Sequence, residues 1–198
     1  MVAASSTILV DILTALYKPF WFSVVLSILF MFLILYAREH GWKNAAVIFW
    51  KHLRAEKEYR RLFVLVFYTV MILFRTLFER TLWTNPLSDV IGNWQIIDQN
   101  GQLNMEPLEN LLLLIPFMAM LLWNFREKII GEAGSIGKTM LQSIKISFLF
   151  SLTIEFLQLL LHLGTFQLSD LFYNTLGGII GGLLYWIGDR VKHRKQSE

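Results

Sequence analysis

The residues of this chain that could do chemistry lie in two apolar stretches in its C-terminal half. Glu155, Gln158 and His162 recur three and four residues apart, so they share one face of a helix. Asp170 and Asn174 share one face of the next helix. A carboxylate inside a membrane span is costly, and it points into a bundle or a wet cavity where it finds a partner. The two faces therefore predict one polar pocket between neighbouring helices.

The composition of the chain is typical of a membrane protein. Of its 198 residues, 55% are hydrophobic and 17% are charged, and apolar runs of about 20 residues recur. We expect an all-α fold: a polytopic membrane helical bundle with five transmembrane helices plus an amphipathic interfacial helix. The lack of cysteine excludes disulfides and thiolate metal sites. The net charge of +3 is not a signal for nucleic acid, because its distribution along the chain matters more.

Five apolar segments are expected to span the membrane, and they cover residues 20–36, 62–78, 108–123, 146–163 and 171–187. Residues 1–61 hold an N-terminal segment (an interfacial helix or a disordered tail), the first span and a basic cytoplasmic amphipathic helix over 37–61. Residues 62–187 form a four-span domain, and 188–198 form a basic cytoplasmic tail. Pro116 predicts a kink. Asn100-Gly101 predicts a hairpin turn in the loop 81–107, and 124–145 is expected to be a loop.

Basic residues predict the orientation of these spans. Residues 37–61, 124–145 and the C-terminal tail hold almost all of them, whereas the other two loops hold one arginine, Arg80. The N-terminus is then expected outside the plasma membrane and the C-terminus in the cytoplasm. This topology places polar residues of four helices at one depth, near the outer leaflet. We expect them to line a ligand-binding cavity made of Arg75, Arg80, Glu109, Asn110, Glu155, Gln158, His162, Asp170 and Asn174.

Four motifs follow one another in residues 62–187. They are T-L-F-E-R ending at Arg80, E-N-L-L-L-L-I-P-F from Glu109, S-L-T-I-E-F-L-Q ending at Gln158, and D-L-F-Y-N-T-L-G-G-I-I-G from Asp170. Together they resemble the VanZ-like family of bacterial membrane proteins. The resemblance implies a place in the bacterial plasma membrane and lowered susceptibility to teicoplanin-type lipoglycopeptides. The chain departs from the family pattern before Asn174, where it keeps one acidic residue.

The leading hypothesis is that the cavity binds an amphiphile, either the acyl chain of such a drug or an envelope lipid. Arginines would hold an anionic head while apolar walls take the chain. One alternative is an intramembrane enzyme that modifies a lipid-linked cell-envelope precursor, with Glu155 or Asp170 as acid or base. A second alternative is a small transporter. The expected partner is a membrane lipid or lipoglycopeptide, and the oligomeric state is not predicted.

Structural roles for the same residues also stay open. Glu155 could form a buried ion pair with an arginine or His162, or be a neutral carboxylic acid. No catalytic residue is assigned. His162 is expected to be a hydrogen-bonding residue rather than a metal ligand, so no metal or cofactor is expected. The pairs Gly177/Gly181 and Gly178/Gly182 predict close packing against a neighbouring helix.

Overall fold

The structure is a computed structural model that describes residues 20–39, 42–78, 85–97, 101–131, 134–161 and 164–196. Within these ranges the regular elements are helices, and the β-type pairing is an isolated antiparallel bridge between Ile97 and Leu103. The bridge joins residues on either side of the predicted Asn100-Gly101 turn; Gly101 has a positive φ of 76°, and Asn100 lies outside the described residues. The chain divides into two compact units, Met1–Arg75 and Thr76–Glu198.

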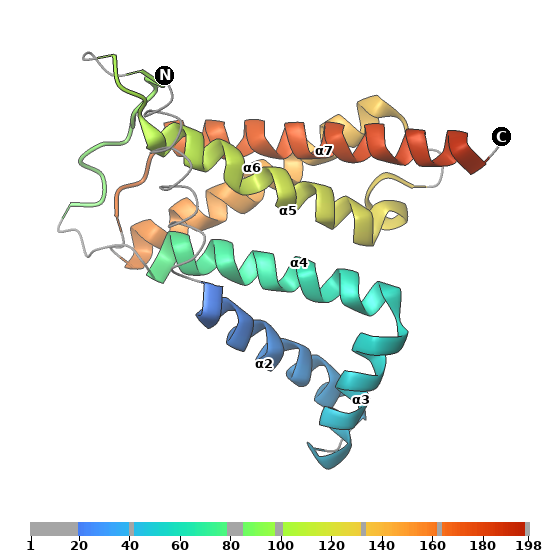
Figure 1. Ribbon diagram of the computed structural model, residues 1–198. Helices are drawn as coiled ribbons and strands as arrows, with labels where there is room; N and C mark the ends of the chain where they lie inside the picture. Colours follow the sequence, from blue (N-terminus) through green and yellow to red (C-terminus); the bar gives the residue numbers. More distant parts are fainter. Residues whose placement is uncertain are drawn as a thin grey trace. The chain divides into compact units, whose positions relative to one another are not determined.

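The first unit contains the helices α2 (Phe20–Glu39), α3 (Trp42–Ala55) and α4 (Lys57–Leu73). The three helices pack against one another (Figure 1). Their shared core consists of Met31, Leu35 and Phe49, each less than 5% exposed. Phe49 stacks on Phe32 with ring centroids 5.1 Å apart, so an aromatic contact fixes α3 against α2.

The basic segment is divided among three helices, and the prediction of one amphipathic helix over 37–61 was wrong in its bounds. Glu56 has an extended backbone (φ −105°, ψ 118°) and separates α3 from α4. Arg60 Nη1 donates to the carbonyl of Arg54 at 2.7 Å, which satisfies an acceptor at the C-terminal end of α3. Periodicity did not locate this break because Ala, Glu and Lys all favour helix on either side of it.

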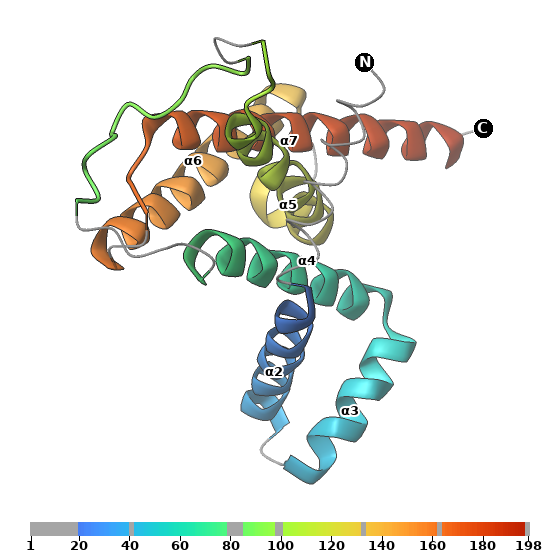
Figure 2. The ribbon, with the colours of Figure 1, turned by 60° about the vertical axis from the view of Figure 1, so that its left-hand side comes forward.

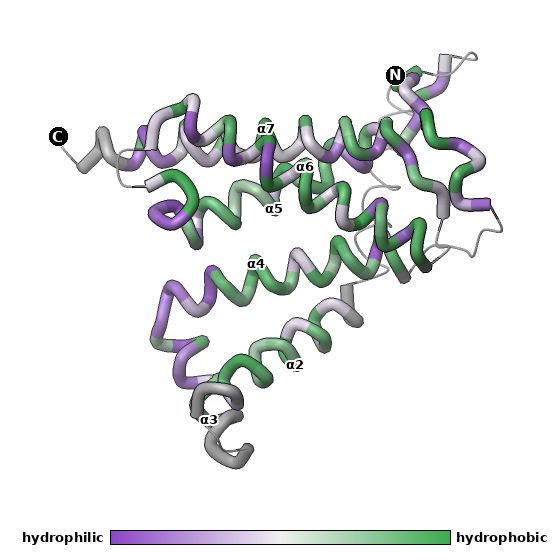
Figure 3. The backbone as a smooth tube through the Cα atoms, turned by 180° about the vertical axis from the view of Figure 1, so that it is seen from behind, coloured by the Kyte–Doolittle hydropathy of each residue, from purple (hydrophilic) through white to green (hydrophobic). Residues whose placement is uncertain are grey.

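The second unit contains the helices α5 (Met105–Ile130), α6 (Ile136–Leu161) and α7 (Leu168–Gln196). All three are long and apolar enough to cross a membrane, judged by length and composition. Figure 3 shows hydrophobic residues along most of α5. α7 packs against both α5 and α6 (Figures 1 and 2). In the first unit, the apolar stretch Leu26–Tyr36 is shorter, so five spans remain a prediction.

The helices of the second unit continue past the apolar segments. Because α5 ends at Ile130 and α6 begins at Ile136, the predicted loop over 124–145 was wrong. α7 likewise continues through most of the predicted tail. Gly131, with a positive φ of 74°, ends α5. Apolar periodicity marks the lipid boundary rather than the helix end, and charged residues with high helix propensity extend the helix beyond it.

The irregularity inside α5 lies near its C-terminal end. Phe125 has non-helical backbone angles of φ −128° and ψ 28°. Pro116, where a kink was expected, lies within the helix upstream of that point. Arg126 Nε, the next residue after Phe125, lies 3.5 Å from Asp189 Oδ2 of α7. The two helices therefore remain joined past the irregular residue.

One glycine pair brings α7 against the backbone of α5. A Cβ atom on Gly177 would clash with the carbonyl oxygen of Leu111, and one on Gly181 would clash with that of Ile115. The two helices can approach this closely because glycine has no side chain there.

The second glycine pair brings α7 against α6. A Cβ on Gly178 would clash with the hydroxyl of Ser147, and one on Gly182 with that of Ser143. Since Gly177 and Gly178 are adjacent, they point to different sides of the helix. The predicted close packing is confirmed, with two neighbours instead of one.

Candidate ligand-binding site

A row of small and polar side chains runs along one face of α6. Thr139, Ser143, Ser147 and Ser151 follow at four-residue spacing, and Glu155 continues the row. All five are at most 1% exposed. Residues four apart lie above one another on a helix, so this row carries polarity through the interior of the unit.

Buried polar side chains gather where the row ends and the chain turns into α7. We call this group the polar cluster, and it contains Ser151, Glu155, Gln158, Gln167, Ser169, Asp170 and Asn174. None of its members is more than 8% exposed. Burying polar groups is costly unless they are hydrogen-bonded, so their partners decide what the cluster can do.

Glu155 and Gln158 join α6 to segments distant in sequence. Glu155 Oε2 accepts a hydrogen bond from the backbone N–H of Gln167 at 2.9 Å, in the turn before α7. Gln158 Nε2 donates to the carbonyl of Thr76 at 2.7 Å, in the π-helix η1 (Phe74–Phe78). The Glu155 contact is charge-assisted if the carboxyl is ionised, which makes it a strong restraint on the turn.

Ser151 has the environment of a structural hydroxyl rather than a nucleophile. Asn174 Nδ2 donates to its Oγ at 2.9 Å, which joins α6 to α7. The partner that the structure gives Ser151 is thus an amide donor, whereas an activated serine needs a base that accepts its proton. Ser169 Oγ lies 3.5 Å from Asp170 Oδ1 at the edge of the cluster.

Residues 85–97, which we call the strap, lie over the turn that leads into α7 (Figures 1 and 2). The backbone N–H of Phe166 donates to the carbonyl of Pro86, and that of Leu168 to the carbonyl of Val90, both at 2.9 Å. These two backbone hydrogen bonds hold the strap parallel to the turn. The strap therefore covers that side of the polar cluster.

Gln167 connects the strap to the buried carboxylate. Its Nε2 donates to Asp89 Oδ2 of the strap at 3.2 Å, while its backbone N–H donates to Glu155. Gly92 lies directly against this turn, because a Cβ there would clash with the hydroxyl of Ser169. Gly92 also has a φ of +71°, so glycine is favoured here on two counts.

Three buried amide atoms have no hydrogen-bond partner within the part of the chain that the structure describes: Asn174 Oδ1, Gln167 Oε1 and Asn110 Nδ2. Asn174 is 3% exposed and Gln167 is 8% exposed. Asn110 precedes Leu111, whose carbonyl lies against Gly177, one turn beyond Asn174. The unpaired donor, Asn110 Nδ2, and the unpaired acceptor Asn174 Oδ1 therefore lie at similar levels along the helices of the second unit. Unpaired buried amides indicate a place for a polar ligand group or water.

The structure brings together four of the predicted cavity residues: Glu155, Gln158, Asp170 and Asn174. Asn110 and the adjacent Glu109 belong to α5 in the same unit. Arg75 is the last residue of the first unit. Arg80 and His162 lie outside the described residues. The carboxylate and amide part of the predicted site thus forms one buried group, and its role in ligand binding stays a prediction.

Sequence reasoning missed other members of the site. The four-residue spacing of serines that ends at Glu155 was a signal for Ser151. No pattern indicated Gln167, Ser169 or Asp89, because the contact between strap and turn joins two irregular segments distant in sequence. Among the described residues, no three histidine or acidic side chains are placed to hold a metal ion.

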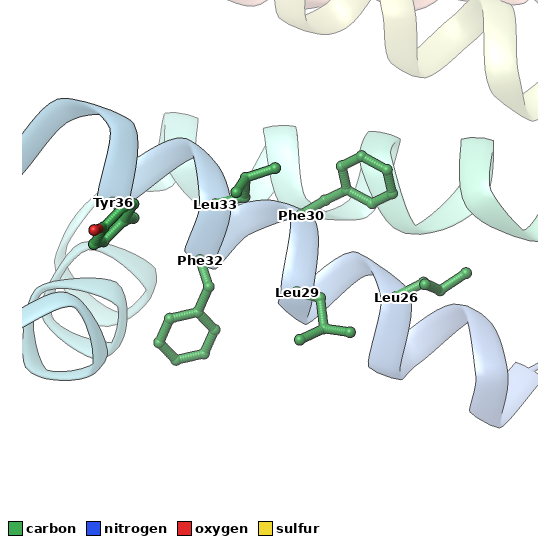
Figure 4. A pocket seen from close by; sticks show the side chains of 6 residues that line it. All are labelled: Leu26, Leu29, Phe30, Phe32, Leu33 and Tyr36. Carbon is green, nitrogen blue, oxygen red and sulfur yellow. The ribbon is translucent and has the colours of Figure 1, made fainter. Parts of the chain in front are cut away.

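A separate apolar groove of about 380 Å³ lies on α2 in the first unit (Figure 4). It is lined by Leu26, Leu29, Phe30, Phe32, Leu33 and Tyr36. Its walls carry a single polar group, the Tyr36 hydroxyl, and most of these side chains are at the surface. This groove suits contact with lipid chains and offers nothing for chemistry.

The family model for VanZ/LLP1 matches residues 20–189, which include the polar cluster and all of the described helices except the C-terminal end of α7. The chain is 30% identical over 93 residues to Protein VanZ of Enterococcus faecium, a match that covers 47% of this chain and 52% of that protein. The chain thus spans about half the length of this curated relative. No solved structure matches. The resemblance noted in the four motifs is confirmed, and the chain belongs to the VanZ/LLP1 family.

Proposed function

We propose that this protein lowers susceptibility to teicoplanin-type lipoglycopeptides by binding an amphiphile, the drug or an envelope lipid, at the polar cluster. Membership of the VanZ/LLP1 family and the similarity to Protein VanZ support the resistance-type role. The observation that supports binding is the set of buried amide atoms without a partner among the described residues, led by Asn174 Oδ1 and Gln167 Oε1. In the five-span topology with the N-terminus outside, the start of α7 faces the outer leaflet, where the drug arrives.

The chemistry of the cluster favours a ligand head rich in hydrogen-bond donors. The two unpaired atoms among its described members are both acceptors, the amide oxygens Asn174 Oδ1 and Gln167 Oε1. Sugar hydroxyls and amide N–H groups of a glycosylated head would complement them. Leu168 and Phe172 of α7 are 44% and 49% exposed and offer a surface for an acyl chain. The strap covers the adjoining turn, so binding includes its displacement.

The test is drug susceptibility of a sensitive host that carries the full chain. Teicoplanin is the test drug, and vancomycin, which lacks the acyl chain, is the control drug. The variants are Glu155→Gln and Asp170→Asn, and the matched control is Glu127→Gln, an exposed carboxylate on α5. Membrane levels are equalised by blot. We expect the wild type and Glu127→Gln to protect against teicoplanin alone and the cluster variants to lose that protection. Equal protection by all chains would make the cluster a scaffold.

A binding measurement separates the proposed function from the two alternatives. The purified full chain is titrated with teicoplanin and its thermal unfolding midpoint is recorded. For a binder whose ligand donates to an ionised Glu155, Glu155→Gln removes a charge-assisted contact of about 1.5–3 kcal/mol, so Kd should rise by roughly 10- to 100-fold together with the loss of protection. An enzyme would keep its affinity in this variant while protection disappears. A transporter would show drug or lipid flux in liposomes.

A further inference from the structure

The helix α3 in the first unit has two faces of opposite character. Its inner face is anchored by Phe49, which is 2% exposed. The Phe49 ring packs edge-on against Tyr59 at 6.0 Å and Phe63 at 6.5 Å, both on α4, and it stacks on Phe32 of α2. These contacts fix the rotation of α3 about its axis, so its outer face is a defined surface.

The outer face of α3 combines apolar and cationic side chains. Val47, Trp50, Lys51 and Arg54 line one shallow hollow, at the spacing of three and four residues that keeps them on one side of the helix. Val47 is 68% exposed and Trp50 is 55% exposed. The guanidinium carbon of Arg54 lies 5.8 Å from the centroid of the Trp50 ring. We call these four residues the basic face.

The cations of the basic face are available for an external anion. The nearby acidic residues pair elsewhere, Glu56 with His52 at 2.6 Å and Glu58 with Arg61 at 4.0 Å. In the described part of the first unit, no carboxylate forms an ion pair with Lys51 or Arg54 within 4.0 Å. With respect to the described residues, the basic face thus carries two positive charges without a carboxylate partner, beside exposed apolar side chains.

The neighbouring helices place the basic face at the edge of an apolar layer. α2 leads into α3 and exposes Leu29, Phe30 and Leu33 by 49–62%, as expected of a helix that faces lipid (Figure 4). α4 begins with charged residues at Lys57 and becomes hydrophobic further along (Figure 3). A helix at such a boundary with Trp and Val among Lys and Arg is typical of the membrane interface.

We propose that the basic face binds the anionic headgroups of phospholipids in the leaflet that α3 meets. Arg54 offers a planar fork to a phosphate, and Lys51 adds a point charge beside it. Trp50 and Val47 enter the apolar boundary and hold the helix at headgroup depth. In the five-span topology this leaflet is the cytoplasmic one. The proposal is independent of the polar cluster and of its ligand.

The experiment measures lipid preference of the purified full chain in detergent. The probes are phosphatidylglycerol and phosphatidylcholine with identical acyl chains, and native mass spectrometry gives the ratio of the two apparent affinities. We expect the wild type to prefer phosphatidylglycerol. In the double variant Lys51→Gln/Arg54→Gln, the ratio of the affinity for phosphatidylglycerol to that for phosphatidylcholine should fall about thirtyfold. The matched control Lys138→Gln/Lys192→Gln removes two exposed cations of the second unit and should keep the preference.

Two further measurements keep the proposal testable if the double variant does not fold. The charge-conserving variant Lys51→Arg/Arg54→Lys should retain the preference, and high salt should reduce it in the wild type. The proposal is wrong if the wild type shows no preference for phosphatidylglycerol. It is also wrong if the neutral double variant keeps the preference, if the control variant loses it equally, or if the charge-conserving variant loses it.

Discussion

The two units of this chain hold their helices together by different means. In the first unit, α2, α3 and α4 pack against an apolar core formed by Met31, Leu35 and the aromatic ring of Phe49. In the second unit, the interface of α6 and α7 is made of serines, glycines and the polar cluster. Lipid chains are as apolar as leucine, so apolar burial drives helices together weakly inside a membrane. Close backbone approach and hydrogen bonds must replace it.

The difference explains where a site can form. In the first unit, the unpaired buried polar atoms among the described residues include the hydroxyls of Ser23 and Ser27, which lie on one helix and away from any cluster of amides and carboxyls. An interior built from hydroxyls, amides and carboxyls must pair every group, and the second unit leaves Asn174 Oδ1 and Gln167 Oε1 unpaired among its described residues. The polar interior that joins the helices is therefore also the region with capacity to bind.

The largest effect is expected at the glycine contact with α5. Gly181→Leu would drive a side chain into the carbonyl of Ile115, whose backbone cannot move away without separating the helices. We expect a loss of about 3 kcal/mol or more in the free energy of unfolding, measured by thermal unfolding and size-exclusion profile. Gly188→Leu on the same helix is the control, because a Cβ there meets nothing within 4 Å. Equal losses in both would mean that close approach does not hold α7.

The next effect is expected in the first unit. Phe49→Ala removes the ring that α2, α3 and α4 share and should cost about 3 kcal/mol locally. Hydrogen exchange should show faster exchange in these three helices and unchanged exchange in α6 and α7. Leu33→Ala, at a position that is 62% exposed, is the control. Faster exchange throughout the chain would contradict the division into separately stabilised units.

A smaller effect is expected at Glu155. Glu155→Ala leaves the backbone N–H of Gln167 without its acceptor, which should cost about 2 kcal/mol in the free energy of unfolding. Glu155→Gln retains a carbonyl oxygen and should lose less. If both substitutions stabilise the chain, the carboxylate is kept for function at the expense of stability. If neither changes the unfolding midpoint, the turn is held by its other bonds.

The smallest effect is expected at the strap. Asp89→Ala removes the acceptor of Gln167 Nε2 and should loosen residues 85–97 by about 1 kcal/mol. Limited proteolysis of the strap should become faster while the global unfolding midpoint stays the same. Ser88→Ala, an exposed neighbour, serves as the control. A lowered midpoint would show that the strap is part of the core of the second unit.

The helices could be located from the sequence but their ends could not. The apolar segments at 108–123, 146–163 and 171–187 lie largely within α5, α6 and α7. The segment after Trp123 is polar yet helical, because arginine, glutamate and lysine favour helix wherever a helix has already begun. Gly131 stops α5, and its positive φ is a backbone property that hydropathy does not report. Hydropathy therefore locates the membrane layer, and backbone conformation sets the helix length.

The candidate site could be predicted where polar residues interrupt apolar helices. For Glu155 and Asn174, a place in the helix bundle interior costs less free energy than exposure to lipid, so their burial follows from hydropathy. Gln167 could not be predicted, because its place depends on a backbone bond to Glu155. Asp89 meets Gln167 through a contact between irregular segments, which has no periodic signature in the sequence.

The two glycine pairs of α7 bear on how copies of this protein could assemble. On an isolated span, a Gly-x-x-x-Gly pattern is a common surface for dimerisation. Here Gly177 and Gly181 are occupied by α5, and Gly178 and Gly182 by α6, within one chain. Neither surface can receive a second copy unless the unit opens. Any homo-oligomer of this chain must therefore form through other surfaces, and its glycine motifs do not predict its stoichiometry.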